Sequence, residues 1–478
     1  MRRGVAIATM LALSGCMVGP DYRRPATELP GSFAQSGGAG QAAAAIPGDW
    51  WRLFGDPVLD DLVESALAVN VDIAQAVARI EEADANLRAV NAALFPEIDL
   101  AGAAVRSASS TKVAAPAPPI VRNDVRLAFT TSYEIDFWGK LRRASEAARA
   151  TDLSTRYARD VVTLSVAALT TQTYFLLRSL DAQIAATRAT LASRDDTLTI
   201  VRRRADGGLA SDLEVRQAEG ARSDAAFQLD ELLRERSLAE HLLATVTGRL
   251  DLAIPAGDLA HLPLPAMPPP GLPSTMLERR PDIRQAEQDL VTASAEIGVA
   301  RAQMFPTITL TGAFGGESAS LAGLFTVPGR IWALGAGLSA PIFEAGRLSA
   351  LVDVQRARER QALAAYQRSI QTAFREVEDA LTNVQRYAAL EGDAQASVDA
   401  AREALRLANV RYGAGYTGFL DVLDSQRSLN IAELALIRSR QNLLSAGVDL
   451  MMALGGGWEP AAAEGRSAGP NVVTAASE

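Results

Sequence analysis

The sequence has few of the residues that build catalytic and metal-binding sites. It contains one cysteine, Cys16, and two histidines, His241 and His261. A single cysteine excludes a disulfide within the chain and disfavours a thiolate metal site. Neither histidine has an acid and a nucleophile at a useful spacing, and no Gly-rich phosphate-binding loop is present. The sequence therefore predicts no enzyme, and neither a metal nor a cofactor.

Two further absences narrow the class of protein. The chain has no excess of positive charge, since its net charge is −9. A nucleic-acid partner would normally need a basic surface, so the charge argues against one. Long apolar runs are lacking outside the N-terminus, so the chain does not resemble a helical integral membrane protein. With 48% hydrophobic and 22% charged residues, it is not a disordered chain either.

The N-terminus has the pattern of a bacterial export signal. Residues 1–22 read MRRGVAIATMLALSGCMVGPDY. Two arginines precede an apolar segment that is too short to span a bilayer, and small residues then lead to Cys16. We expect a signal peptide over residues 1–15, and Leu13 to Cys16 resemble a lipobox, in which the cysteine after the cut carries the lipid. Several acyl chains there would anchor the protein firmly. The alternative is an ordinary signal peptide with an incidental cysteine.

Four segments alternate apolar and polar residues as half-buried strands do. In the clearest of them, residues 124–137, Val125, Leu127 and Phe129 alternate with more polar neighbours. The other three are residues 97–106, 307–316 and 330–343. Each is long enough for a tilted membrane-spanning strand. A soluble sandwich would alternate in the same way, but four strands in so long a chain cannot build one beside so much helix.

Helix-breaking residues are missing from very long stretches. There is no proline between Pro119 and Pro255 and no glycine between Gly139 and Gly207. A helix through the second stretch would be roughly 100 Å long, which a compact globule cannot hold. Earlier in the chain, residues 60–94 also read as one helix, which Pro96 ends.

The two halves of the chain repeat each other. FPEIDLAGA at residue 95 recurs as FPTITLTGA at residue 305, and GLASDLEV at 208 corresponds to GYTGFLDV at 415. The pattern indicates a tandem duplication in which each half reads helix, two strands, long helix, turn, long helix. The expected segments are a signal peptide (1–15), a lipid-anchored extended segment (16–55), a first repeat (56–253, with long helices over 140–205 and 211–248), a Pro-rich linker (254–274), a second repeat (275–455, with long helices over 346–412 and 418–454) and a flexible tail (456–478).

Several motifs resemble those of the TolC-like outer membrane factors. They are GPDYRRP, YEIDFWGKLRR, LERRPDIRQAEQDL, AQMFPTITLTGAFGG and RYGAGYTGFLDVLDSQRSL. With the lipobox, the chain is most similar to the lipoprotein branch that serves resistance-nodulation-division efflux pumps. The resemblance implies an α+β membrane protein and a homotrimer. Each chain would contribute four strands to a 12-stranded outer-membrane β-barrel and its long helices to a periplasmic α-helical barrel.

The resemblance also implies partners and a location. The protein would lie in the outer membrane of a Gram-negative bacterium, anchored in outer-membrane lipid and extending into the periplasm. There it would contact a periplasmic adaptor (membrane fusion) protein and work with an inner-membrane resistance-nodulation-division transporter. We expect no nucleic-acid partner. Four strands alone cannot close a barrel, since small barrels have about eight, so assembly from several chains would be obligatory.

The glycines of YGAGYTGFLDVLDSQ predict the end of a helical hairpin. Gly413 and Gly415 would end one long helix, and the next would begin near Thr417 or Gly418. In the first repeat, Ser211 and Glu214 have the spacing of a capping box. The resemblance implies that both tips contact the adaptor, through Gly208, Leu209, Ala210, Ser211, Gly415, Tyr416 and Thr417. The alternative is a bare turn without a partner.

Two aspartates follow the second tip. By resemblance, Asp421 and Asp424 line the periplasmic gate of the channel, and Tyr412 matches its gate tyrosine. An arginine that latches this gate in some members is matched by Thr417 here, which puts that latch in doubt. Six carboxylates in one constriction would select cations. The simpler interpretation is that acids in the first turn of a helix suit its dipole.

These observations predict a passive exit duct for drugs or other small toxic compounds, in a tripartite efflux pump. One alternative is the outer-membrane duct of type I protein secretion. Another is a lipid-anchored coiled-coil scaffold that has no pore. The sequence does not identify the substrate, because the lumen of such a duct is wide and polar rather than a shaped pocket.

Overall fold

The computed structural model describes residues 17–34, 46–110, 112, 121–269, 271 and 273–458. The expected signal peptide, Cys16 and most of the expected C-terminal tail lie outside these residues. The elements in chain order are η1 (Trp50–Phe54), α2 (Pro57–Val69), α3 (Val71–Ala92), β1 (Glu97–Ala108), β2 (Val121–Ile135), α4 (Lys140–Asp206), α5 (Asp212–Val246), η2 (Pro273–Thr275), α6 (Met276–Arg279), α7 (Pro281–Ala302), β3 (Thr307–Ser318), η3 (Leu321–Gly323), η4 (Val327–Gly329), β4 (Arg330–Ser339), α8 (Arg347–Gly413) and α9 (Phe419–Ala453).

The chain divides into two compact units, and each takes segments from both repeats. The strand unit comprises Met1–Ala26, Ala78–Arg156 and Gln285–Gln367, and the helical unit comprises Thr27–Val77, Tyr157–Arg284 and Arg368–Glu478. The repeats are therefore not separate domains. Segments that are about 200 residues apart in the sequence share one sheet or one bundle.

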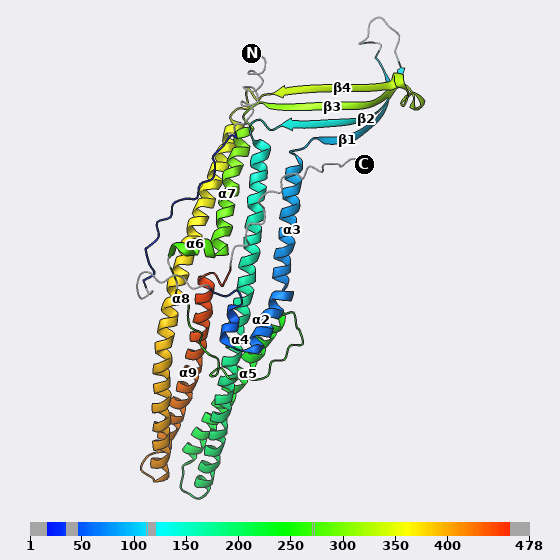
Figure 1. Ribbon diagram of the computed structural model, residues 1–478. Helices are drawn as coiled ribbons and strands as arrows, with labels where there is room; N and C mark the ends of the chain where they lie inside the picture. Colours follow the sequence, from blue (N-terminus) through cyan, green and yellow to red (C-terminus); the bar gives the residue numbers. More distant parts are fainter. Residues whose placement is uncertain are drawn as a thin grey trace, which may run out of the picture. The chain divides into compact units, whose positions relative to one another are not determined.

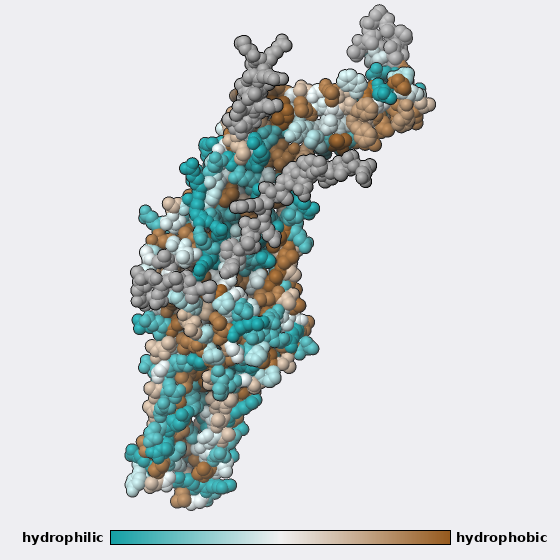
Figure 2. All heavy atoms as spheres, in the orientation of Figure 1, coloured by the Kyte–Doolittle hydropathy of each residue, from teal (hydrophilic) through white to brown (hydrophobic). Residues whose placement is uncertain are grey.

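The four strands form one antiparallel sheet in the order β1-β2-β3-β4 (Figure 1). Leu100, Phe129, Phe314 and Trp332 lie in one row across it, because the register pairs each with the next. Side chains alternate between the faces of a sheet, so one face carries these apolar residues and the other carries mainly small and polar ones. Figure 2 shows hydrophobic residues in brown along the strands. Among the described residues, β1 and β4 each pair on one side only.

Two of the expected element boundaries were wrong. β4 ends at Ser339, before the expected 343, and Pro341 explains this because proline has no N–H for the strand ladder. The single helix expected over residues 60–94 is two helices, α2 and α3, with a break at Asn70. The Asn70 side chain accepts from the Asp72 amide and donates to the Val246 carbonyl, so it caps α3 and ties the break to α5.

The first described residues after the expected anchor, 17–26, are fixed to the rest of the strand unit. Arg24 forms a bidentate ion pair with Glu287 of α7. The guanidinium atoms Nε and Nη2 lie 2.7 and 2.8 Å from the two carboxylate oxygens. Asp21 pairs at 2.6 Å with the buried Arg143 of α4, which also pairs with Glu146. Removing one partner from such a buried charge is costly. Asp21 and Arg24 of GPDYRRP therefore bind the segment to α4 and α7.

The junction of sheet and helix explains the YEIDFWGKLRR motif. The Asp136 carboxylate accepts hydrogen bonds at 3.0 Å from the first amides of α4, those of Leu141 and Arg142. The Trp138 indole donates to the Pro306 carbonyl at 2.7 Å and stacks on Phe305 with ring centres 4.6 Å apart. One motif thus starts the long helix and joins the first repeat to the second.

The helical unit has its main core around η1, α2, α4 and α5, with Trp50, Phe54, Tyr174 and Phe175 at its centre. An ionic cluster borders this core. Asp181 accepts from Arg178, from Arg236 at 2.7 Å and from the Gly257 amide at 3.1 Å. The two arginines also donate to the Pro255 and Ile254 carbonyls. The cluster fixes the start of the Pro-rich linker against α4 and α5.

Candidate functional site at the helical tips

The first hairpin turn, between α4 and α5, is built by a glycine and a serine. The Leu209 amide donates to the Arg204 carbonyl at 2.7 Å and the Gly208 amide donates to that of Ala205 at 2.9 Å, which is a Schellman motif. Gly208 has φ 70°, a left-handed conformation that a side chain would disfavour. Ser211 then starts α5 through the predicted capping box with Glu214, which is confirmed.

The second turn, between α8 and α9, has the same construction. Tyr416 donates to Arg411 at 2.9 Å, Gly415 donates to Tyr412 at 3.1 Å, and Gly415 has φ 77°. Gly413 is the last residue of α8, and Gly418 is the N-cap of α9 without a side-chain bond. Gly415 is therefore explained by a turn that needs a left-handed residue at this position. Both turns lie at the lower end of the bundle in Figure 1.

A small apolar cluster joins the two hairpins behind their turns. It consists of Leu198, Val201, Ala218, Ala408, Phe419 and Val422, which come from α4, α5, α8 and α9. Tyr412 packs at its edge, with its ring centre 5.6 Å from that of Phe419. The tips are thus one packed structure within the chain, because all four helices bury side chains in the same cluster.

Tyr412, the expected gate tyrosine, lies under a cation from the other hairpin. The Arg204 guanidinium carbon is 4.6 Å from the centre of the Tyr412 ring. Burial raises the pKa of Tyr412, although the nearby Arg204 charge lowers it in part. Its hydroxyl has no hydrogen-bond partner among the described residues. The sequence did not point to Arg204, because it lies 208 positions before Tyr412 and matches no motif.

The two expected gate aspartates have different neighbours. The Thr417 hydroxyl donates to the Asp421 carboxylate, and Asp424 pairs with Arg427 at 2.7 Å. Asp421 is in the first turn of α9, but Asp424 is not, so the dipole interpretation was wrong for Asp424. Thr417, the position that the resemblance matches to a latch arginine, therefore bonds one of the two expected gate aspartates of its own chain.

Both aspartates line one cleft of about 620 Å³ between the hairpins. Arg194 of α4 also lines it, with Asp224 of α5. Arg194 is buried, donates to the Ala221 carbonyl and leaves its Nε without a hydrogen bond among the described residues. Burial lowers the pKa of Arg194. The cleft therefore contains a mixed set of charges, of which the sequence indicated only Asp421 and Asp424.

The residues expected to contact an adaptor form the outer surface of the turns. Leu209 is 74% exposed and Tyr416 is 79% exposed. In a Schellman motif the residue at this position often packs back on the helix, but neither does so here. Gly208, Ser211 and Gly415 are exposed as well, whereas Ala210 and Thr417 are half-buried. Leu213 and Leu420, just beyond the two turns, are exposed as well, and such a group of exposed apolar side chains is typical of a contact surface.

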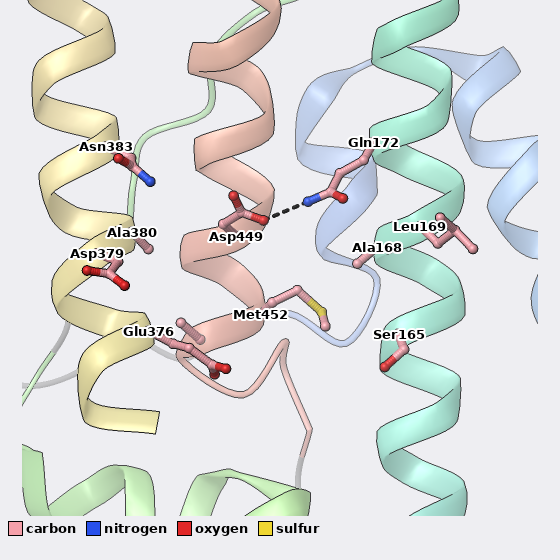
Figure 3. A pocket seen from close by; sticks show the side chains of 11 residues that line it. Ser165, Ala168, Leu169, Gln172, Glu376, Asp379, Ala380, Asn383, Asp449 and Met452 are labelled. Atoms are coloured by element: carbon pink, nitrogen blue, oxygen red, sulfur yellow. Dashed lines mark hydrogen bonds between the residues drawn. The ribbon is translucent and has the colours of Figure 1, made fainter. Parts of the chain in front are cut away.

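A second cleft, of about 460 Å³, lies between α4, α8 and α9 (Figure 3). The Gln172 amide donates to the Asp449 carboxylate at 2.6 Å. Glu376, Asp379 and Asn383 of α8 line the opposite side. Burial raises the pKa of Asp449, and the bond from Gln172 lowers it in part. The described residues contain no group of His, Cys, Asp and Glu that could hold a metal ion.

Comparisons with known proteins match nearly the whole chain. A family model described as outer membrane efflux protein matches residues 62–249 and 272–456. The outer membrane protein OprJ of Pseudomonas aeruginosa is 34% identical over 465 residues, which cover 97% of this chain and 96% of that protein. The toluene efflux pump outer membrane protein TtgF of Pseudomonas putida is 34% identical over 472 residues, covering 95% and 97%. The crystal structure of the Campylobacter jejuni CmeC outer membrane channel superposes with a TM-score of 0.86 at 26% identity, covering 93% of this chain and 96% of CmeC.

Proposed function

The chain belongs to the outer membrane efflux protein family, and from this premise we propose that it is the exit duct of a tripartite efflux pump. Members of this family are passive channels of the outer membrane and not enzymes. The observation that carries the proposal is the four-stranded sheet, which has one apolar face and two edges without a strand partner among the described residues.

Three copies of this sheet would close a barrel. In lipid, unpaired backbone groups at an open edge cost several kcal/mol each, so β1 of one chain would pair with β4 of the next. Four strands from each of three chains make twelve, which lies within the range of outer-membrane barrels. The apolar face would then contact lipid, and the small and polar face would line the lumen.

Aromatic residues lie at two levels along the direction of the strands, which supports a membrane location for the sheet. Phe305 and Trp138 stack at the helix end, and Phe314 and Trp332 are paired near the other end. Phe305 and Phe314 are nine positions apart, or about 30 Å along an extended chain. A strand tilt of about 40° reduces this to roughly 23 Å, close to the height of about 25 Å between the aromatic girdles of such barrels.

The long helices would form a tunnel in the periplasm. Among the described residues only α4 has an apolar window long enough to cross a bilayer, and half of that window is buried in the protein, as in the core helix of a bundle. We propose that the tips, with the exposed Leu209 and Tyr416, contact the periplasmic adaptor. Through it the duct would connect to an inner-membrane resistance-nodulation-division transporter, which supplies the energy.

The tip residues would also control passage. In a trimer, three copies each of Asp421 and Asp424 would meet near the axis and attract cations. The stacking of Arg204 on Tyr412 would hold the two hairpins of each chain together. It would replace the latch that an arginine forms in some family members, which the uncharged Thr417 cannot form. Cys16 would carry the lipid that anchors the segment after it, which Arg24 and Asp21 fix to the strand unit.

The proposed cargo is small toxic compounds. The relative TtgF is described as part of a toluene efflux pump, and toluene is a small apolar molecule. We extend this class of cargo, drugs and organic solvents, to the present chain. A wide polar lumen would let such compounds pass without a shaped binding pocket.

Deletion of the gene tests the proposal. We expect a deletion strain to retain more of a lipophilic fluorescent dye and to grow less well with organic solvents, and the intact gene should restore both. Secreted proteins should be unchanged. Loss of one secreted protein with normal dye efflux would favour the protein-secretion duct. No change in either, with the helical unit bound to a partner, would favour the scaffold.

A further inference from the structure

The connection between β3 and β4 is an uncharged loop with an apolar surface. Residues 319–329 read ASLAGLFTVPG and contain no charged side chain. Leu321, Phe325 and Val327 are between 73% and 83% exposed. A loop in water normally carries polar residues, and clustered exposed apolar side chains mark a contact surface. In Figure 1 this loop is the short curl at the end of β3 and β4.

The loop has a defined conformation and folds back on the apolar face of the sheet. Leu324 is only 5% exposed, and its carbonyl oxygen lies so close to Gly316 that a Cβ there would overlap it. Gly316 is on the same face as Phe314 because the two are two positions apart in β3. The Thr326 hydroxyl donates to the Gly323 carbonyl at 2.7 Å and fixes the turn between η3 and η4.

A groove of about 270 Å³ lies between the loop and the sheet. Leu100, Phe129 and Phe314 line it from the strands, and Leu324 and Phe325 line it from the loop. Its one charged lining residue is Arg330, which forms no ion pair with any residue that the structure describes. The groove thus has apolar walls and a cation on its rim.

We propose that this loop is inserted at the boundary between the headgroups and the acyl chains of the outer leaflet. The inference rests on the proposed function, because it needs the apolar face to contact lipid. The loop lies beside the aromatic row that Phe129, Phe314 and Trp332 form across the strands. In outer-membrane barrels, such aromatic residues lie at the level of the headgroups. An acyl chain fits the apolar walls of the groove. Arg330, on the rim of the groove, would lie at the level of the headgroups and could pair with an anionic one.

Fluorescence quenching by lipid tests the inference. Leu321→Cys and Phe325→Cys are made in a Cys16→Ser background, which removes the only other thiol. The cysteines are labelled with a nitrobenzoxadiazole dye, and the proteins are reconstituted in phosphatidylcholine–phosphatidylglycerol vesicles. We expect nitroxide-labelled lipid to quench both labels at least twofold more than a label at Thr130→Cys on the polar face. Aqueous iodide should quench them little.

A label at Phe129→Cys on the apolar face separates this inference from the proposed function. If the Phe129 label is quenched by lipid but the loop labels respond to iodide, the loop lies in water and the inference is wrong. If lipid quenches Phe129 while the loop labels respond to neither quencher, a neighbouring chain covers the loop, and the inference is again wrong. If Phe129 itself is not quenched by lipid, the proposed barrel fails and the inference fails with it.

Discussion

The Arg204 guanidinium carbon lies 4.6 Å from the centre of the Tyr412 ring, so a cation from α4 covers an aromatic ring from α8. This contact joins the two hairpins just behind their turns. A cation over an aromatic face contributes about 0.5 to 2 kcal/mol, depending on how dry the site is.

Replacing Arg204 by alanine should therefore loosen the tips. We expect backbone amides of residues 405–420 to exchange hydrogen about fivefold faster, which corresponds to about 1 kcal/mol. Hydrogen–deuterium exchange with mass spectrometry measures this. Arg203→Ala is the matched control, because Arg203 is exposed and stacks on no ring in the described part of the chain. Equal exchange in the two variants would show that the stacked pair does not hold the tips.

The turn glycines should be intolerant of side chains. Gly208→Ala and Gly415→Ala place a Cβ in the left-handed region, which costs about 1 to 2 kcal/mol each. Gly220→Ala, in the exposed interior of α5, should instead stabilise the helix by about 0.5 to 1 kcal/mol. Thermal unfolding followed by circular dichroism should shift in opposite directions. Unchanged or raised stability in the Gly208 and Gly415 variants would contradict the assignment of the turns.

The sequence predicted the regular elements well because their signals are local. Alternation gave the four strands and their faces, and the absence of glycine and proline gave the long helices. The contacts between repeats could not be predicted in this way. Arg204 meets Tyr412, and Trp138 meets Pro306, across long stretches of chain with no shared periodicity. Residues 319–329 fold onto the sheet through the close approach of Leu324 to Gly316. No periodic pattern in the sequence predicts this contact.

The exposed apolar tips should be needed for pump function but not for folding. Leu209→Asp combined with Tyr416→Asp should abolish dye efflux in the complemented deletion strain, because an apolar contact cannot form around two added charges. Leu250→Asp is the matched control, since Leu250 is equally exposed but lies beyond the other end of α5. Normal efflux by the double variant, at normal protein levels, would exclude an adaptor contact through these residues.

The anchor is tested by changing the single thiol. Cys16→Ser should abolish labelling by radioactive palmitate while the trimer still forms, because the strands and helices do not depend on that residue. Mass spectrometry of the mature N-terminus identifies the modification on the parent protein. An unmodified cysteine there, or cleavage at another position, would exclude the lipid anchor.

The central claim is that the chain forms a passive pore whose tip carries Asp421 and Asp424, and single-channel recording in planar bilayers tests it most directly. The parent trimer should conduct with a preference for cations. Asp421→Ala combined with Asp424→Ala should at least double the resting conductance and weaken that preference. The substitutions remove the carboxylates from the constriction, and with them the cations that these carboxylates attract. Unchanged current would leave the two aspartates as helix residues only. A folded trimer that inserts into the bilayer but conducts no ions, with or without the aspartates, would contradict the whole account.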